Sequence, residues 1–219
     1  MTRRNKEQLL TEIHNHGVNI DTREIFLNSY ICDTDDDPGL DYRSSIAFIK
    51  NLRLLEHLGE NPILIHLTSI GGGVDDGLAI YDAIKTSPLQ VTILVHGYAL
   101  SMGVMILQAA DNRVMMPNSY LMIHDTSVNV GDKAAAAEAF MEFHKSQSQN
   151  MIDILCNKCA GSLFAEEHKL NLPKVKSYIK VILQQKQDWY LDANGAVYHG
   201  LADAIIGIKQ FMTISSLNV

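Results

Sequence analysis

The sequence predicts a single domain of the α/β class, in which parallel strands alternate with helices. Short apolar runs typical of buried strands are followed repeatedly by segments with apolar residues at helical spacing. Turn-forming residues separate these segments, and an apolar content of 47% over 219 residues suffices for a sizeable core. Such alternation implies right-handed crossovers with helices covering the sheet. We expect this domain at residues 21–219, preceded by a polar N-terminal arm at residues 1–20.

The first half of the chain contains most of the expected strand and helix pairs. An acidic loop at residues 32–39 lacks the glycine and terminal glutamate spacing of an EF-hand, so we interpret it as a solvated loop. The expected strands are residues 23–29, 62–68, 91–95 and 120–124, and the expected helices are residues 42–58, 76–85 and 102–110.

A single long helix is expected over residues 133–159. Four large apolar residues fall on one face of it: Phe140, Phe143, Met151 and Ile154. Gln147 interrupts this face, and the helix is longer than a small core requires, so we expect part of it to project and pack on another subunit. The remaining expected elements are helices at residues 172–187 and 194–199 and strands at residues 189–191 and 201–206.

Composition limits the classes of partner. A net charge of −7 and a pI near 5.7 argue against a nucleic-acid or an anionic membrane surface, which would gather lysines and arginines. The charged N-terminus lacks the apolar core of a signal peptide, and no apolar run reaches membrane-spanning length. We therefore expect a cytoplasmic protein.

The cysteines favour a reducing compartment, because three are too few and too oddly numbered for a disulfide framework. Cys156 and Cys159 form a C-x-x-C pair. A zinc site would need a second ligand pair, and a redox site a thioredoxin-like context. We expect two cysteines one turn apart on a helix, with no metal and no cofactor.

A serine and a histidine are the strongest candidates for chemistry. Ser101 follows an apolar strand and begins an apolar helix, with Gly97 expected to let the chain turn, and His124 ends a strand. The unpaired N–H groups and positive dipole at a helix start would favour an anion forming beside Ser101. Taken alone, such a serine is most often an N-cap and such a histidine a satisfied or surface residue.

A glycine turn at residues 71–73 follows another expected strand. Glycines let the backbone approach a ligand closely and direct N–H groups at it, which suits a phosphate or an oxyanion. The turn lacks the lysine of a P-loop and the spacing of a dinucleotide site, so nucleotide binding is weakly supported. A purely structural turn is the other interpretation.

In order, the glycine turn, the Gly-x-x-x-Ser-Met-Gly segment at 97–103 and the Pro-Asn-Ser-x-x-Met-Ile-His segment at 117–124 resemble the proteolytic subunit of the Clp protease family. The resemblance extends through residues 77–82 and 200–203 and covers most of residues 23–207. It implies a crotonase-like fold of stacked βαβ units, a serine endopeptidase acting on polypeptides, and a homo-oligomer of stacked rings with internal active sites.

Position by position, the resemblance implies a nucleophile at Ser101 and a general base at His124. It further implies an oxyanion hole formed by the N–H groups of Gly72 and Met102. In divergent members, the segment containing Val130 and Gly131 would pair with an extended substrate as an added strand.

The third member of the triad departs from the family pattern. Gln184 stands where the family has an aspartate, and Asp188 follows one helical turn later. Asp125 is a poor substitute, because adjacent residues on a strand point to opposite faces. Either Asp188 orients His124, or Gln184 or a backbone carbonyl does, or the site is a dyad.

Two further departures concern the partner. The strand before the glycine turn carries His66 rather than the aromatic residues that help receive an AAA+ ATPase, and extra residues lie in the acidic loop and between 168 and 174. These differences argue against docking of a standard ATPase and favour a divergent or phage-type member. Gln184 also leaves open a weak or inactive ring subunit. A crotonase-type acyl-CoA enzyme is disfavoured, because no glutamate lies near Gly103.

Overall fold

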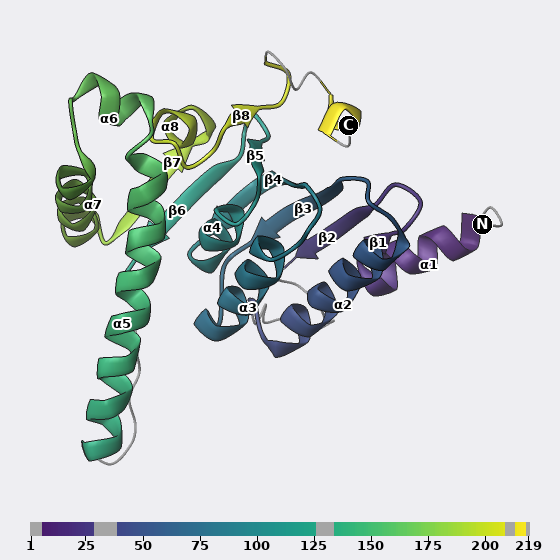
Figure 1. Cartoon of the computed structure of the whole chain (residues 1–219), viewed down its shortest axis with the longest axis horizontal. Helices are drawn as coiled ribbons and strands as arrows, with labels where there is room; N and C mark the ends of the chain where they lie inside the picture. The colour runs from purple at the N-terminus through teal and green to yellow at the C-terminus, as the bar shows by residue number, and fades with distance from the viewer. Residues whose placement is uncertain (1–5, 29–38, 126–133, 209–212, 218–219) are drawn as a thin grey trace.

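The computed structural model describes residues 6–28, 39–125, 134–208 and 213–217, and it confirms the α/β class. Figure 1 shows a central sheet with helices packed against it and one long helix extending away from this body. The acidic loop, apart from Gly39 at its end, and the segment with Val130 and Gly131 lie outside the described residues.

The described residues form one eight-stranded sheet in the order β1-β2-β3-β4-β5-β8, with β6 pairing to β4 and β7 to β6. The strands are β1 (Val18–Asn19), β2 (Glu24–Asn28), β3 (Ile63–Ser69), β4 (Val91–Leu100), β5 (Asn112–Met115), β6 (Tyr120–His124), β7 (Asp188–Asp192) and β8 (Ala204–Ile205). The central pairs are parallel as expected, but β1 is antiparallel to β2 and β7 to β6. An entirely parallel arrangement is therefore wrong at these two edges.

β4 is longer than expected and organises the site. Its first half pairs with β5 and its second half with β6. The turn expected at Gly97 is wrong, because Gly97 lies inside the strand with a φ of 65°. The chain turns instead at Ser101, directly after the strand ends.

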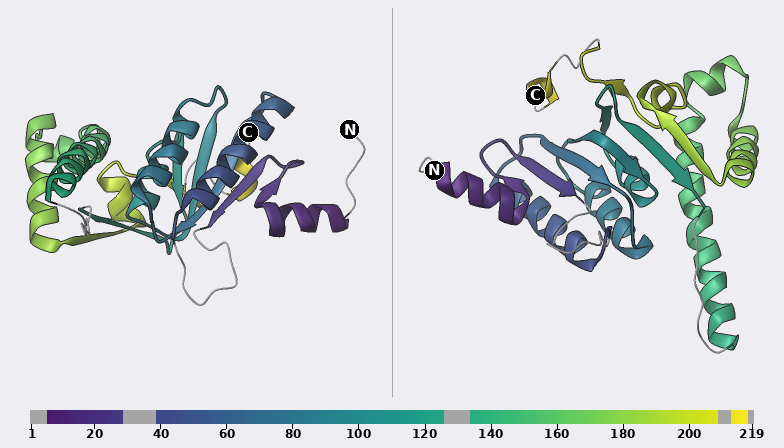
Figure 2. Two further views of the ribbon diagram at one scale, coloured as in Figure 1. Left: turned by 90° about the horizontal axis from the view of Figure 1, so that it is seen from below. Right: turned by 180° about the vertical axis from the view of Figure 1, so that it is seen from behind.

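Three helices cover one face of the sheet: α2 (Tyr42–Leu58), α3 (Val74–Lys85) and α4 (Met102–Leu107) (Figures 1 and 2). Their apolar faces bury against the strands, with Leu52 and Ile80 fully inaccessible to solvent. A short 3-10 helix at Ile214–Leu217 packs Leu217 against Leu64 and Leu94 in a separate small cluster. The sheet therefore buries apolar side chains on both faces.

The expected long helix is α5 (Ala134–Cys159), followed by α6 (Leu163–Glu167), α7 (Leu172–Lys186) and α8 (Ala193–Tyr198). Figure 1 shows its N-terminal half projecting beyond the sheet. The expected apolar stripe divides at this point, since Met151 is buried whereas Phe140 and Phe143 are 43% and 57% exposed. Only the C-terminal half of the stripe is core.

The N-terminal arm contains more regular structure than its polar sequence suggests. A helix, α1, spans Lys6–His16, and β1 then pairs Val18 with Ile25 at the edge of the sheet. No helix among the described residues is long and apolar enough to cross a membrane.

Cys156 and Cys159 are buried one turn apart on α5, as expected. Burial, together with the neighbouring Cys156, raises the pKa of Cys159 to about 12, which leaves this thiol unreactive at neutral pH. Among the residues described, no group of three metal-ligating side chains comes together.

Candidate active site

Ser101 lies at the junction of β4 and α4 in a backbone conformation that side chains rarely adopt. Its φ is 51° and its ψ is −118°. A non-glycine residue in such a region costs on the order of 1–3 kcal/mol, and this kind of strain clusters at functional sites. The Ser101 N–H donates to the Met122 carbonyl at 2.8 Å, which holds the strained residue against β6.

The Ser101 side chain does not act as a helix cap. It occupies the N-cap position of α4 but makes no capping hydrogen bond to the described residues. Its Oγ lies instead 2.7 Å from the Nε2 of His124. The contact follows from the sheet, because Leu100 pairs with Met122 in the parallel register of β4 and β6, and the two side chains lie just beyond that pair.

Asp188 is the carboxylate that the sheet places beside His124. The two residues face each other directly in the antiparallel pairing of β6 and β7, which brings their side chains to the same face. The Oδ1 of Asp188 lies 3.8 Å from the Nδ1 of His124. This separation is longer than a hydrogen bond, and 51% of the Asp188 side chain is exposed.

The other candidates for orienting the histidine face different partners. Asp125 accepts a hydrogen bond from the Ser148 hydroxyl at 2.9 Å. Gln184 lies on α7 and lines a pocket together with Asp125 and Lys180. Of the three side chains considered from the sequence, Asp188 is the one that the structure places within 4 Å of the His124 imidazole.

The glycine turn lies directly against Ser101. Gly71 has a φ of 91°, and a Cβ added to it would come within 2.7 Å of the Ser101 Cβ and 3.1 Å of the Met102 nitrogen. Gly72 follows with a φ of 148°. Within the described part of the chain, the N–H groups of Gly72 and Met102 donate no hydrogen bond. Both donors are thus available close to Ser101.

An apolar pocket opens beside Ser101 and His124, and it was not predicted from the sequence. Its apolar lining comes from four elements that meet there: Met102, Val104, Met105, Ile123, Met151, Ile152, Leu155 and Leu183. The buried half of α5 supplies one wall. The available sequence signal was the apolar spacing at the C-terminal end of that helix.

Two neighbouring residues of α5 form hydrogen bonds beside the site, one to the helix that follows the glycine turn and one to the residue that follows His124. The Gln147 Nε2 donates to Asp75 at 2.9 Å, and Asp75 is in the first turn of α3, just after the glycine turn. The Ser148 hydroxyl donates to Asp125, which directly follows His124. Gln147, seen in the sequence as an interruption of the apolar face, is therefore a tether between helices.

His66 is part of a polar cluster on β2, β3 and β4. Its Nδ1 lies 2.9 Å from the His96 Nε2, and its ring stacks on Phe26 with centroids 4.7 Å apart. The Glu24 carboxylate is 3.8 Å from its Nε2. The nearby His66 imidazole lowers the pKa of Glu24, although burial opposes this change.

Comparisons with known proteins match most of the chain to one family. The family model described as Clp protease matches residues 19–209. The ATP-dependent Clp protease proteolytic subunit 2 of Pseudomonas aeruginosa is 26% identical over 178 residues, which cover 80% of this chain and 81% of that protein. Proteolytic subunit 3 of Synechococcus sp. (strain CC9902) is 30% identical over 147 residues, covering 66% of each chain.

A solved structure of a ClpP1 point mutant from Listeria monocytogenes superposes with a TM-score of 0.63 at 23% identity. The match covers 87% of this chain and 94% of that one. At this identity it supports the fold, and it confirms the expected crotonase-like architecture. The family model and the shared fold together show that this chain belongs to the Clp protease family.

Proposed function

We propose that this chain is a serine endopeptidase, a Clp-type proteolytic subunit that cleaves extended polypeptide inside an oligomeric ring. The observation that carries the proposal is the 2.7 Å contact between the Ser101 Oγ and the His124 Nε2 at a strained residue. A serine hydroxyl is a poor nucleophile until an imidazole accepts its proton.

In the proposed reaction, the Ser101 Oγ attacks the scissile carbonyl carbon while the His124 Nε2 takes the hydroxyl proton. The carbonyl oxygen becomes an oxyanion that accepts hydrogen bonds from the N–H groups of Gly72 and Met102. His124 then returns the proton to the leaving amine nitrogen, and the C–N bond breaks. The acyl part of the substrate remains as an ester on the Ser101 Oγ. Water, deprotonated by the same imidazole, hydrolyses this ester and restores Ser101.

Asp188 is proposed to orient His124 through its Nδ1–H. The 3.8 Å separation needs only a small side-chain rotation to become a hydrogen bond. Because the Asp188 carboxylate is half exposed, its influence on the imidazolium is screened by water and weaker than that of a buried triad aspartate.

The apolar pocket beside Ser101 supports a substrate preference. A side chain next to the scissile bond would leave water for a lining of methionine, leucine and isoleucine side chains. We infer that the enzyme prefers an apolar residue at that position. Pairing of the substrate with Val130 and Gly131 remains part of the proposal.

The relatives are named ATP-dependent, so an AAA+ ATPase is the class of partner that the family suggests. On this chain, the outer face of β3 is already engaged, with His66 contacting His96 and Leu64 covered by Leu217. We infer that a standard docking segment of an ATPase would bind this face poorly.

A catalytically weak ring subunit is the second candidate, favoured by the long Asp188 to His124 separation and by Gln184 in place of an aspartate. Cleavage of a dye-labelled unfolded protein distinguishes the two, measured on fractions of defined oligomeric state with Ser101→Ala as the control. The peptidase proposal predicts cleavage by the ring fraction and none by the variant. Rings of the native chain that do not cleave would favour the second candidate.

A further inference from the structure

The glycine turn beside Ser101 is held by a segment from a distant part of the chain. The Leu40 N–H donates to the Gly71 carbonyl at 2.6 Å, and the Gly73 N–H donates to the Leu40 carbonyl at 2.7 Å. These two bonds form an isolated parallel bridge between Leu40 and Gly72. Because Leu40 is 1% exposed, its buried side chain fixes the backbone that brackets Gly72.

The packing between this segment and Ser101 leaves no free space. A Cβ on Gly39 would lie 2.5 Å from the Gly71 carbonyl oxygen, and one on Gly72 would lie 2.2 Å from the Leu40 nitrogen. On the other side, Gly71 presses against Ser101. A shift of residues 39–41 is therefore transmitted to the peptide of Gly72 rather than absorbed by a gap.

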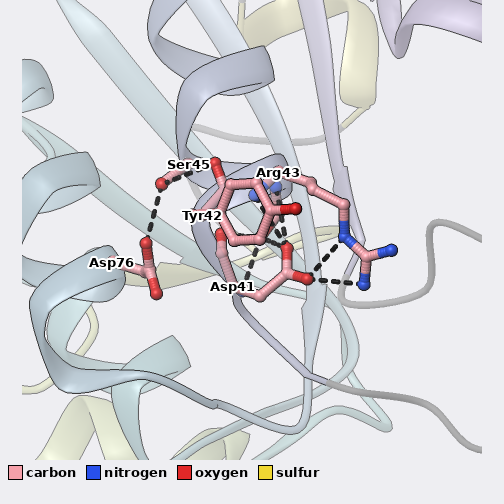
Figure 3. A network of polar contacts seen from close by, with 6 residues as sticks. Asp41, Tyr42, Arg43, Ser45 and Asp76 are labelled. Carbon is pink, nitrogen blue, oxygen red and sulfur yellow. Dashed lines mark hydrogen bonds and ion pairs between the residues drawn. The ribbon is translucent and has the colours of Figure 1, made fainter.

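The segment is anchored by the start of α2. Asp41 is the N-cap, and its Oδ1 accepts from the N–H groups of Arg43 at 2.9 Å and Ser44 at 3.1 Å. The Asp41 N–H in turn donates to the Ser44 hydroxyl, which completes a capping box. Figure 3 shows Asp41 also paired with the Arg43 guanidinium.

A second connection joins α2 to the element that follows the glycine turn. The Ser45 hydroxyl, on a residue that is 4% exposed, donates to the Asp76 carboxylate at 3.0 Å (Figure 3). Asp76 is in the first turn of α3. The glycine turn is thus bonded to Leu40, just before α2, and the helix that follows the turn is bonded to Ser45 in the first turn of α2.

We propose that Asp41 and the backbone of Leu40 are positioning residues for the oxyanion hole. The Asp41 cap sets the entry of the chain into α2, this sets Leu40, and Leu40 sets the direction of the Gly72 N–H. The proposal rests on the proposed function, since it assigns a catalytic consequence to that N–H. A donor fixed in advance is effective only when it points at the developing oxyanion, so small displacements are costly.

The test compares two N-cap deletions. Asp41→Ala removes the cap of α2, and Asn171→Ala removes the cap of α7, where the Asn171 Oδ1 accepts from the Lys174 N–H. With a peptide substrate, Asp41→Ala should lower kcat by about 10- to 100-fold with little change in KM. Asn171→Ala should lower Tm similarly and leave kcat unchanged, whereas Asp41→Asn, which retains a cap, should restore kcat.

Hydrogen–deuterium exchange of the peptide containing residues 70–74 gives a readout that does not require activity. Asp41→Ala should speed exchange of the Gly73 amide, which is bonded to the Leu40 carbonyl, and Asn171→Ala should not. Unchanged exchange in Asp41→Ala, or equal losses of kcat in both cap variants, would overturn the positioning role. If Asp41→Ala speeds this exchange but the native chain has no peptidase activity, the proposed function is rejected and the structural coupling is retained.

Discussion

The Nε2 of His124 lies 2.7 Å from the Oγ of Ser101, across two neighbouring parallel strands. This distance is that of a direct hydrogen bond, and it is reached without any movement of either strand. The arrangement predicts that His124→Gln lowers kcat by about 10⁴-fold or more, because Ser101 then has no proton acceptor. Peptidase assays on the His124→Gln variant, with its folding checked by circular dichroism, measure this loss of kcat. Retention of a tenth of the activity would contradict the prediction.

Asp188→Asn should lower kcat less than the loss of a buried triad aspartate does. We expect a decrease of about 10- to 100-fold, because the carboxylate is half exposed and 3.8 Å from the imidazole. Gln184→Ala is the comparison and should have a smaller effect on kcat. A larger loss in Gln184→Ala than in Asp188→Asn would assign the orienting role to Gln184.

Gly71→Ala should abolish peptidase activity, because its Cβ would lie 2.7 Å from the Ser101 Cβ at a φ of 91°. Gly97→Ala is a matched control, since Gly97 also has a positive φ but nothing within 4 Å of the added Cβ. It should cost about 1–2 kcal/mol in the free energy of unfolding and leave activity nearly unchanged. Denaturant titrations and steady-state rates provide the two measurements, and an active Gly71→Ala enzyme would exclude the close packing described.

Gln147→Met separates stability from activity. The Gln147 Oε1 is buried with no hydrogen-bond partner among the described residues, and relieving such a group is worth about 1–3 kcal/mol. We expect an unchanged or higher Tm, because this relief offsets the loss of the bond to Asp75. We expect a kcat lowered by up to about 10-fold, because that bond ties α5 to the helix that follows the glycine turn. Gln149→Met on the same helix is the control, and equal kcat values for the two variants would contradict a tethering role.

The free energy of unfolding should decrease as the pH falls below the ordinary histidine value of 6.5. Burial lowers the pKa of His96, aided by the charge of His66, and burial also lowers the pKa of His199, although its bond to the Gly195 carbonyl opposes this. Between the lowered pKa values of the folded protein and the ordinary histidine value, these two histidines bind more protons in the unfolded chain than in the folded one. Their contribution to the free energy of unfolding is therefore fully present only above the pKa of the unfolded chain, and it is lost as the pH falls.

Urea unfolding at about pH 7.5 and about pH 5.5 checks this dependence. His96→Gln and His199→Gln should each reduce the loss of stability, whereas His57→Gln, at an exposed position, should not. Stability that rises on acidification over this range would contradict the direction given for both groups.

The sequence predicted most closely those helices and strands whose first and last residues mark their ends. α2 is expected and observed at Tyr42–Leu58, because Asp41 caps its start and Gly59 follows its end. β5 was missed, since its four residues include the buried Arg113, which pairs with Asp203 ninety positions along the chain. A local sequence pattern does not reveal that a buried arginine is paired with an aspartate so distant in the sequence.

Some parts of the candidate site were likewise predicted from the sequence, and others were not. Ser101 and His124 were predicted because each lies at the end of a regular element with a recognisable local pattern. The bridge between Leu40 and Gly72 joins two loops, and the pocket joins single faces of several helices, so neither has a period in the sequence. The exposed half of α5 was indistinguishable from its buried half, because apolar spacing does not record what covers a face.

Labelling with a serine-reactive fluorophosphonate tests the central claim most directly. Intact mass and peptide mapping should show one adduct on Ser101 of the native chain, much slower labelling of His124→Gln, and no adduct at residue 101 in Ser101→Ala. Such labelling requires the hydroxyl proton to pass to His124 as the phosphorus–oxygen bond forms and the phosphorus–fluorine bond breaks to release fluoride. Assembled native protein that remains unlabelled, or that is labelled at the same rate without His124, would contradict the assignment of these two residues as nucleophile and base.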